Sequence, residues 1–492
     1  MLFVIHIGFF SPLQAKKNQI DIKQQIISGM HSISSHDLFA YVKELCSEKY
    51  GGRLTGTEGY NAATRWVSGL LKKMGIKPGG DNHTYFQAFP NPYTLVFEGS
   101  EAILHIPVAD NQTLLKPYIY EKDFIPGSTS DSGEVTAEVI YVGYGITAPE
   151  LGFDEYKGLD VKGKIVLMER EAPVFPEKEP EEFKKWRDYS FHQYKVKNAK
   201  EHGVAGMLYN YHIANPNCQF IEKFILTYAG PAMINDIFLG TGKTLQQVKK
   251  KIQNNRKPQS FATGKILTLK NNTEHHPDGT AYNVIGILEG QDPEKKGEAI
   301  IIGAHLDHVG CNHLLMPGAN DNASGVAVVL GVAEALSRLP FSLKRTIIFI
   351  LFGAEEQGVV GSQFYLKHPL VPHKKVMAFI NMDGVGRGRK IEALAAQNYP
   401  HIWQYLKRAN QQFVHRVITA EHFHNLARPR LDASRFMWAG IPTISFSSYG
   451  GDKLPYSVYH KTLDTPDIIT PEIMEDLAQL IFVAVAEMAQ VN

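Results

Sequence analysis

Residues 303–325 read GAHLDHVGCNHLLMPGANDNASG and follow the apolar run AIII. The run predicts a buried strand that ends near His305, and the loop after it carries Asp321. Apolar residues recur at helical spacing after this loop, at Val326, Val329, Leu330, Ala333 and Leu336. We therefore expect a helix there, capped by Asn322 or Ser324. Because strand ends in open α/β sheets converge on a crevice, this stretch is where we expect the functional site.

Predicted strands and helices alternate from residue 281 onward. The predicted strands are 282–288, 299–304, 345–352, 376–382 and 442–446, and helices are predicted after residue 324, near 399–412 and from Pro471. This alternation is typical of an α/β sandwich with a central sheet.

The part of the chain before residue 269 differs from this pattern. Two amphipathic helices are predicted over 35–50 and 57–74, with GGRLTGTEG at 51–59 between them and a strand at 84–89. The glycine-rich segment is not a phosphate-binding P-loop, because no strand precedes it and no Lys-Ser/Thr pair follows. From residue 92 to 268, short β-like runs alternate with Gly, Pro and Asp, which predicts a separate β-rich insert.

Composition excludes several classes of protein. The 492 residues contain 51 Lys+Arg and 50 Asp+Glu, so nothing suggests a nucleic-acid or anionic-membrane partner. The three cysteines form no disulfide framework and no cysteine-type zinc site. No apolar run after the N-terminus reaches the ~18 residues of a membrane span.

The first 15 residues raise a question of targeting. Leu2–Phe10 is apolar and Leu13-Gln14-Ala15 resembles a cleavage site, but the basic segment of a signal peptide is missing. The segment is either the remnant of a longer signal peptide or an apolar N-terminus. We favour the signal peptide and hence a secreted or periplasmic protein.

Side chains able to bind metal recur at the ends of predicted strands and in one late loop. They are His305, Asp321, the pair Glu355-Glu356, Asp383 and His460. One acidic residue after a strand is usually a helix cap or a solvated loop residue. Several of them at successive strand ends indicate a metal site.

Charge balance favours two divalent ions. Asp321, Glu356 and Asp383 with one bridging hydroxide offset four positive charges, and the neutral imidazoles of His305 and His460 complete the coordination. Such mixed ligands suit zinc, with manganese or cobalt as the alternatives, and two ions ~3.5–4 Å apart lower the pKa of a shared water. Gly353 and Ala354 let the chain turn before the Glu-Glu pair, so one carboxylate can bind metal while the other acts as a general base.

Five motifs in this segment resemble those of one family. They are HLD at His305, D-x-x-S-G at Asp321–Gly325, the Glu-Glu pair, N-M-D at Asp383 and Y-H-x-x-x-D-T from Tyr459. Together they resemble peptidase family M28, the aminopeptidases with two catalytic zinc ions. GRLTGTEG also resembles the family's N-terminal segment, and residues 92–268 resemble the protease-associated (PA) insert of some members.

The resemblance implies a three-layer α/β sandwich with a central mixed, mostly parallel sheet, the zinc exopeptidase fold. Residues 16–91 and 269–492 would form the peptidase domain around the insert. One zinc ion would be bound by His305 and Asp383, the other by Glu356 and His460, with Asp321 bridging them and Glu355 as general base. The Asp321-Asn322 peptide bond would be cis.

Further roles follow from the same resemblance. Tyr459 would help to stabilise the oxyanion, while Asp307 and Asp464 would orient His305 and His460. Candidate substrate-pocket residues are Phe423, His424, Arg435, Tyr449 and Tyr456. Where many relatives read S-D-H-x-x-F, residues 431–436 read LDASRF, so the family's usual substrate preference does not carry over. The nearby His308 and His313 are not among the expected ligands.

The expected activity is a zinc-dependent removal of N-terminal residues from peptides that have a free N-terminus. A carboxypeptidase or a one-zinc glutaminyl cyclase of the same fold is the alternative. A non-enzymatic receptor with a peptidase-like domain is the alternative of another class, although such proteins have typically lost metal ligands and here none is missing.

Overall fold

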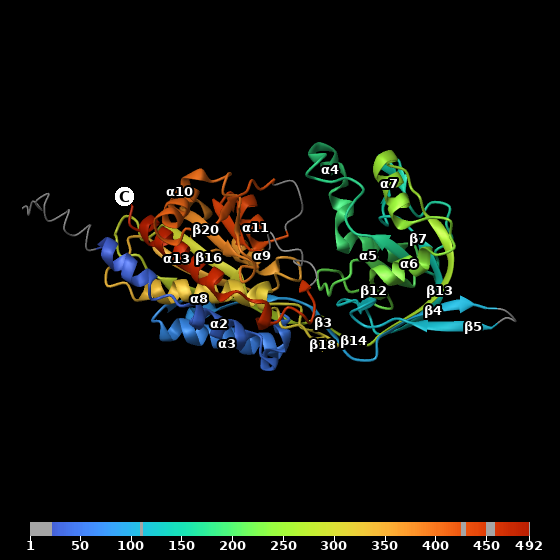
Figure 1. The fold of residues 1–492 in the computed structure, drawn as a ribbon, viewed down its shortest axis with the longest axis horizontal. Helices are drawn as coiled ribbons and strands as arrows, with labels where there is room; N and C mark the ends of the chain where they lie inside the picture. The colour runs from blue at the N-terminus through green and yellow to red at the C-terminus, as the bar shows by residue number, and fades with distance from the viewer. Residues whose placement is uncertain (1–21, 109–111, 425–429, 449–457, 492) are drawn as a thin grey trace, which may run out of the picture.

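A computed structural model describes residues 22–108, 112–424, 430–448 and 458–491. The possible signal peptide at 1–15 lies outside these residues, as do Tyr449 and Tyr456. Among the described residues, no helix is long and apolar enough to cross a membrane. Figure 1 shows two lobes side by side, with the first and last parts of the chain in the larger one.

The large lobe is built on a nine-stranded sheet. Its strands in spatial order are β1 (Lys77–Pro78), β15 (Thr280–Leu288), β19 (Thr346–Phe352), β16 (Ala299–His305), β20 (Val376–Met382), β23 (Thr443–Ser447), β21 (Ile391–Leu394) and β22 (Ile418–Ala420), and β2 (Phe86–Pro90) also pairs with β15. Strands β19, β16, β20 and β23 run parallel to one another. β15 and β21 join this core antiparallel.

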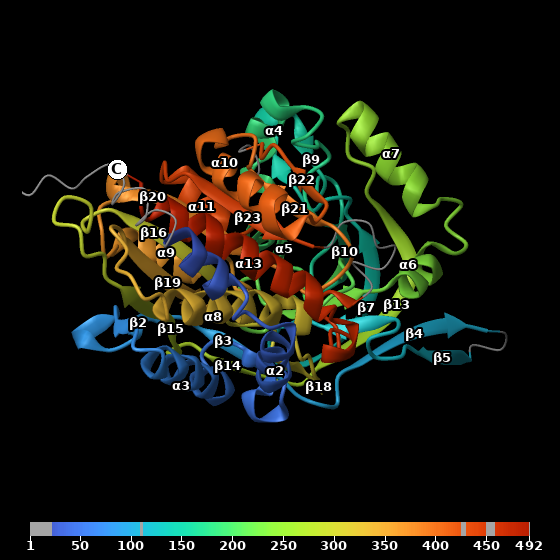
Figure 2. The ribbon, with the colours of Figure 1, turned by 60° about the vertical axis from the view of Figure 1, so that its left-hand side comes forward.

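Helices cover both faces of this sheet. The larger hydrophobic core packs one face against α2 (Ser35–Leu45), α3 (Glu58–Lys73), α8 (Ser324–Ser337), α10 (Pro400–Ala409) and α13 (Pro471–Met488). A smaller core packs the other face against α9 (Val360–Lys367) and α11 (Asp432–Trp438). Figure 2 shows α2 and α3 along the outside of α8. The predicted three-layer α/β sandwich with a mixed, mostly parallel sheet is confirmed.

The inserted lobe has an eight-stranded sheet of its own. Its order is β5 (Thr113–Pro117), β4 (Glu101–Pro107), β13 (Phe261–Asn271), β7 (Gly133–Tyr141), β10 (Ile165–Glu169), β11 (Gly206–Asn210), β12 (Ile225–Ala229) and β6 (Phe124–Pro126). The strand-rich character is as predicted, but the lobe also contains α4 (Pro180–Trp186), α5 (His192–Glu201), α6 (Pro231–Phe238) and α7 (Leu245–Asn255). The sequence of α5, HQYKVKNAKE, has few apolar residues, which explains why its periodicity does not predict a helix.

Two antiparallel strands connect the lobes. β3 (Tyr93–Val96) enters the inserted lobe and β14 (Thr273–His276) returns from it, and the two strands pair side by side. They share a small sheet with β17 (Cys311–Asn312) and β18 (Leu314–Leu315), which belong to the loop between His305 and Asp321. The junction between the lobes is therefore tied to the loop that we expect to carry the site.

Candidate metal centre

Asp321 lies at the centre of the predicted site. Its Oδ1 is 3.3 Å from His305 Nε2, and its Oδ2 is 3.2 Å from His460 Nε2. Asp383 Oδ1 is 3.7 Å from His305 Nε2, while Glu356 Oε2 is 2.9 Å from His460 Nε2. The structure therefore brings all five predicted metal-binding side chains together, and Asp321 presents one oxygen to each half of the cluster.

The chain delivers these side chains from the ends of neighbouring strands. His305 is the last residue of β16, and Asp383 directly follows β20. Glu356 follows β19 after a turn at Ala354, which has a φ of +54°. The Asp321-Asn322 peptide bond is cis, as expected.

Hydrogen bonds hold the loop that carries Asp321. Asn322 Oδ1 accepts the backbone N–H of Gly325 at the start of α8 and that of Gly384 after β20. Asp464 accepts the N–H groups of Asn320 and Asp321 at 2.8 and 3.0 Å. We expected Asp464 to orient His460, but its carboxylate instead fixes the backbone of the Asp321 turn.

Asp307 performs a similar task for the Glu-Glu pair. Its carboxylate oxygens accept the backbone N–H groups of Glu355 and Glu356, both at 3.2 Å. The partner of His305 Nδ1 is the main-chain carbonyl of Asp307, 3.1 Å away, whereas the Asp307 carboxylate lies 3.8 Å from that nitrogen. Asp307 thus supports His305 through its backbone and the glutamates through its side chain.

His460 is oriented by the inserted lobe. Its Nδ1 lies 2.7 Å from the carbonyl oxygen of Ala214, and the backbone N–H of Ala214 donates to the His460 carbonyl. A donor bond from Nδ1 leaves Nε2 unprotonated, which is the form of imidazole that binds metal. No pattern in the insert sequence indicates this contact, because it is made by backbone atoms.

His308 is a member of the cluster that the sequence does not indicate as a ligand. It is fully buried, and its Nδ1 lies 3.0 Å from Glu356 Oε1. The potential ligand atoms form two groups, and within each group all atoms lie within 4.8 Å of one another. The first group is His308, Asp321, Glu356 and His460, and the second is His305, Asp321 and Asp383. Its place in the HLDHV run, three residues after His305, is the signal that could have included it.

The electrostatics of the cluster favour a bound cation. Burial alone would lower the pKa of His305, but contacts with the Asp321 and Asp383 carboxylates raise it well above its usual value. The two imidazoles in turn hold the pKa of Asp321 well below its usual range despite burial. The cluster therefore has a negative potential that its histidines offset when no cation is bound.

The donor atoms also fit a metal. His460 Nε2 is buried and, despite its short distances to two carboxylates, makes a hydrogen bond to neither. Nitrogen and oxygen atoms that converge on one point without bonding each other are what a cation requires. Imidazole and carboxylate together match the ligand preference of zinc.

A cavity of about 110 Å³ opens beside the cluster. It is lined by Glu355, Glu356, Tyr459, His460 and residues of the inserted lobe, including Arg170 and Tyr211. Of the predicted pocket residues that the structure describes, Phe423 packs near Ala433 and Met437, and neither His424 nor Arg435 lines this cavity. The inserted lobe contributes several lining residues that the sequence did not indicate, among them Arg170 and Tyr211.

Comparisons with known proteins indicate which families this chain resembles. Residues 283–485 match the model of peptidase family M28, and residues 135–225 match that of the PA domain. An aminopeptidase of Pseudomonas aeruginosa is 26% identical over 70% of this chain, which spans 56% of that protein's length. Aminopeptidase YwaD of Bacillus subtilis is 26% identical over 70% of this chain and 67% of its own length.

Two solved structures share the fold over nearly the whole chain. The aminopeptidase from Aneurinibacillus sp. strain AM-1 has a TM-score of 0.64 at 21% identity, covering 95% of this chain and 96% of its own. BSAP, a zinc aminopeptidase from Bacillus subtilis, has a TM-score of 0.61 at 20% identity, covering 93% and 96%. The chain therefore has the fold of these aminopeptidases, with a segment, 283–485, that belongs to peptidase family M28 and a PA domain at 135–225 within the inserted lobe.

Proposed function

We propose that this protein is a zinc-dependent aminopeptidase that removes N-terminal residues from peptides. The observation that carries the proposal is the position of Asp321, whose two oxygens face two separate groups of imidazole and carboxylate ligands. Family membership and the relatives named as aminopeptidases support the same activity.

We assign the metal ligands by these contacts. His305 and Asp383 would hold one zinc ion, His460 and Glu356 would hold a second, and Asp321 would contribute to both sites. Bound zinc would supply Lewis acidity and lower the pKa of water at the site. His308 bonds Glu356 through Nδ1 and fixes the orientation of that carboxylate.

Glu355 is the general base of the proposed reaction. It lines the cavity next to Glu356 but belongs to neither group of potential ligands. Burial raises its pKa well above the usual range for a glutamate, although the positive charge of His305 opposes this. A carboxylate of raised basicity accepts the proton of the attacking water and returns it to the amine that leaves.

Tyr459 is the proposed oxyanion stabiliser. Its ring stacks on that of His460, with 3.8 Å between the centroids, and it lines the same cavity. A phenol there donates a hydrogen bond to the oxygen that becomes negative as the peptide bond is attacked.

Blocked peptides test this function. The protein is incubated with zinc and one tetrapeptide sequence in three forms, with free ends, N-acetylated or C-amidated, and products are identified by mass spectrometry. We expect the free and the amidated peptide to lose their first residue and the N-acetylated one to remain intact. Release of the last residue would instead indicate a carboxypeptidase, and formation of pyroglutamate from an N-terminal Gln would indicate a cyclase.

A further inference from the structure

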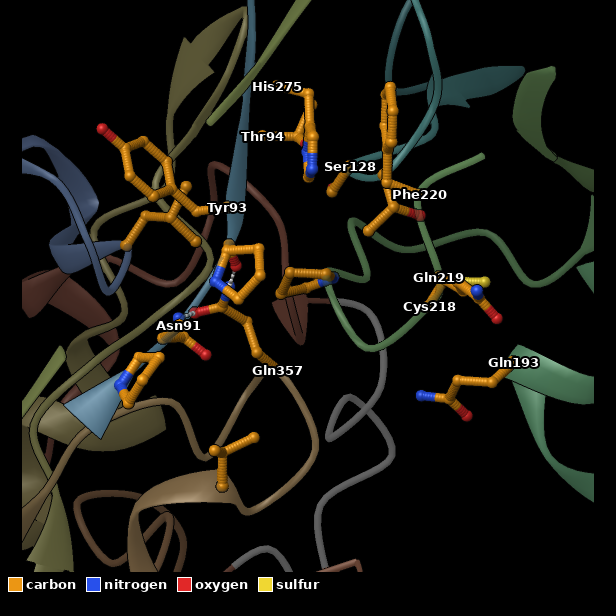
Figure 3. A pocket seen from close by; sticks show the side chains of 16 residues that line it. Asn91, Tyr93, Thr94, Ser128, Gln193, Cys218, Gln219, Phe220, His275 and Gln357 are labelled. Atoms are coloured by element: carbon orange, nitrogen blue, oxygen red, sulfur yellow. Dashed lines mark hydrogen bonds between the residues drawn. The ribbon is translucent and has the colours of Figure 1, made fainter. Parts of the chain in front are cut away.

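A second cavity lies between the two lobes, close to the candidate metal centre. Its volume of about 400 Å³ is typical of a site for a small ligand. Figure 3 shows Asn91 and Gln357 of the large lobe and Tyr93 of the connecting strand β3 on one side, and Gln193 and Phe220 of the inserted lobe on the other. Both lobes therefore contribute to this cavity.

The cavity adjoins the metal centre through two shared segments. Gln357, which lines it, directly follows Glu356 in the chain. In the loop 215–218, Pro216 and Cys218 line this cavity while Asn215 and Asn217 line the one beside the metal ligands. A Cβ at Gly358 would lie 3.0 Å from Asn217 Oδ1, so the loop and the turn after Glu356 are in contact. The two cavities are thus neighbours on either side of this contact.

The lining of the second cavity suits a neutral peptide. Among the residues that the structure describes, the 16 that line the cavity include amides, hydroxyls and aromatic rings but no Lys, Arg, Asp or Glu. Phe220 stacks on His275 with 3.8 Å between the ring centroids and presents a flat apolar surface. Amide and hydroxyl groups can bond the backbone of a peptide, while aromatic rings contact its side chains.

Thr129 provides a second, independent indication of a ligand. Its side chain is 9% exposed, and its Oγ1 is buried without a hydrogen-bond partner among the described residues. A buried hydroxyl without a partner costs free energy, so native proteins rarely retain one that no ligand or water satisfies. Thr129 lines this cavity, and a turn of its side chain about χ1 would bring the hydroxyl from its buried position to a bound ligand.

We propose that this cavity binds the part of the peptide substrate that follows the scissile bond. The inference rests on the proposed aminopeptidase function. The cavity at the metal centre, at about 110 Å³, has little room beyond the residue that is removed, so the rest of the peptide lies elsewhere. The neighbouring neutral cavity offers both the space and the hydrogen-bonding groups.

Substitution Thr129→Val tests the inference with little risk to folding, because the hydroxyl that it removes has no partner among the residues that the structure describes. KM is measured for an aminoacyl arylamide, which has only one residue before the scissile bond, and for a tetrapeptide with the same first residue. We expect KM for the tetrapeptide to rise about three- to tenfold, the loss of one hydrogen bond, while KM for the arylamide stays the same.

Two further variants complete the experiment. Phe220→Ala removes the aromatic surface and should raise the tetrapeptide KM about five- to tenfold. Ser260→Ala, which removes another buried unpartnered hydroxyl but one outside the cavity, should change neither KM. The Glu355→Gln variant, which should bind the tetrapeptide without cleaving it, allows the affinity to be measured directly. We expect this affinity to fall when Thr129→Val is added.

The possible failures are distinguishable. Equal KM values for the tetrapeptide in the unmodified protein and in both cavity variants would overturn the inference, as would an equal rise for both substrates. If the unmodified protein cleaved neither substrate, the proposed function itself would be wrong. The binding measurement tests the cavity independently, because equal tetrapeptide affinity of Glu355→Gln with and without Thr129→Val would show that the cavity does not bind the peptide.

Discussion

At the scale of single residues, Arg53 links the N-terminal segment to the metal centre. Its fully buried guanidinium donates to the carbonyl oxygens of Leu306, Leu45, Pro317 and Gly318, at 2.7 to 2.9 Å. These bonds fix both ends of the loop between His305 and Asp321. A lysine offers one point charge and cannot reproduce this planar set of donors, so Arg53 explains why a segment distant in sequence accompanies the site.

The role of Glu355 gives the first prediction at this scale. Substitution Glu355→Gln keeps the shape of the side chain but removes the proton acceptor. We expect kcat to fall about 10²- to 10⁴-fold, the usual contribution of a general base, while bound zinc is unchanged. Steady-state kinetics and elemental analysis of the same sample measure both. Near-normal kcat, or loss of zinc, would show that Glu355 does not have this role.

At the scale of elements, the loop 211–217 of the inserted lobe supports His460. Ala214 accepts the Nδ1–H of His460, and the carbonyl of the next residue, Asn215, accepts a bond from the Tyr228 hydroxyl at 2.7 Å. Tyr228 is fully buried in β12. The inserted lobe therefore helps to build the candidate metal centre.

Substitution Tyr228→Phe tests this support. Loss of the hydroxyl frees the loop, and disturbed support of a metal ligand commonly weakens metal binding about 10- to 100-fold. We therefore expect Tyr228→Phe to lose half of its zinc at a lower chelator concentration than the unmodified protein, by at most about tenfold. Tyr156→Phe is the matched control, because Tyr156 lies in the same hydrophobic cluster and its buried hydroxyl has no hydrogen-bond partner in the described part of the chain. Equal zinc retention in the two variants would mean that the loop does not hold His460.

The longer elements of the large lobe were predictable because they have strong local signals, whereas the short elements α9, α11, β21 and β22 were not predicted. The apolar runs before His305 and Asp383 match β16 and β20, and the pattern around Pro471 matches α13. The ends of parallel strands meet at one edge of a sheet, so side chains that follow predicted strands are expected to lie close together. The cluster of five ligands could be predicted for this reason. His308 escaped prediction because a histidine in a loop is usually a rim residue, whereas this one is buried against Glu356.

At the scale of the whole molecule, the relation between the lobes could not be predicted. The Ala214 contact involves backbone atoms, and the cavity near Thr129 and Gln357 joins residues far apart in sequence. No periodicity or motif reports such tertiary contacts. An ion pair between Arg430 and Glu171, 3.1 Å apart, likewise joins the lobes beside the metal centre without any signal in the sequence. Substrate selection, which we expect to depend on this junction, is therefore a property of the folded molecule.

The central claim is that the chain holds two zinc ions on ligands that share Asp321. Zinc bound per chain after dialysis against a low zinc concentration, measured by elemental analysis, tests this most directly. The account predicts two zinc ions per chain in the unmodified protein and fewer in Asp321→Ala, because that carboxylate faces both halves of the cluster. A protein that retains no zinc, or an Asp321→Ala variant that retains as much as the unmodified protein, would contradict the account.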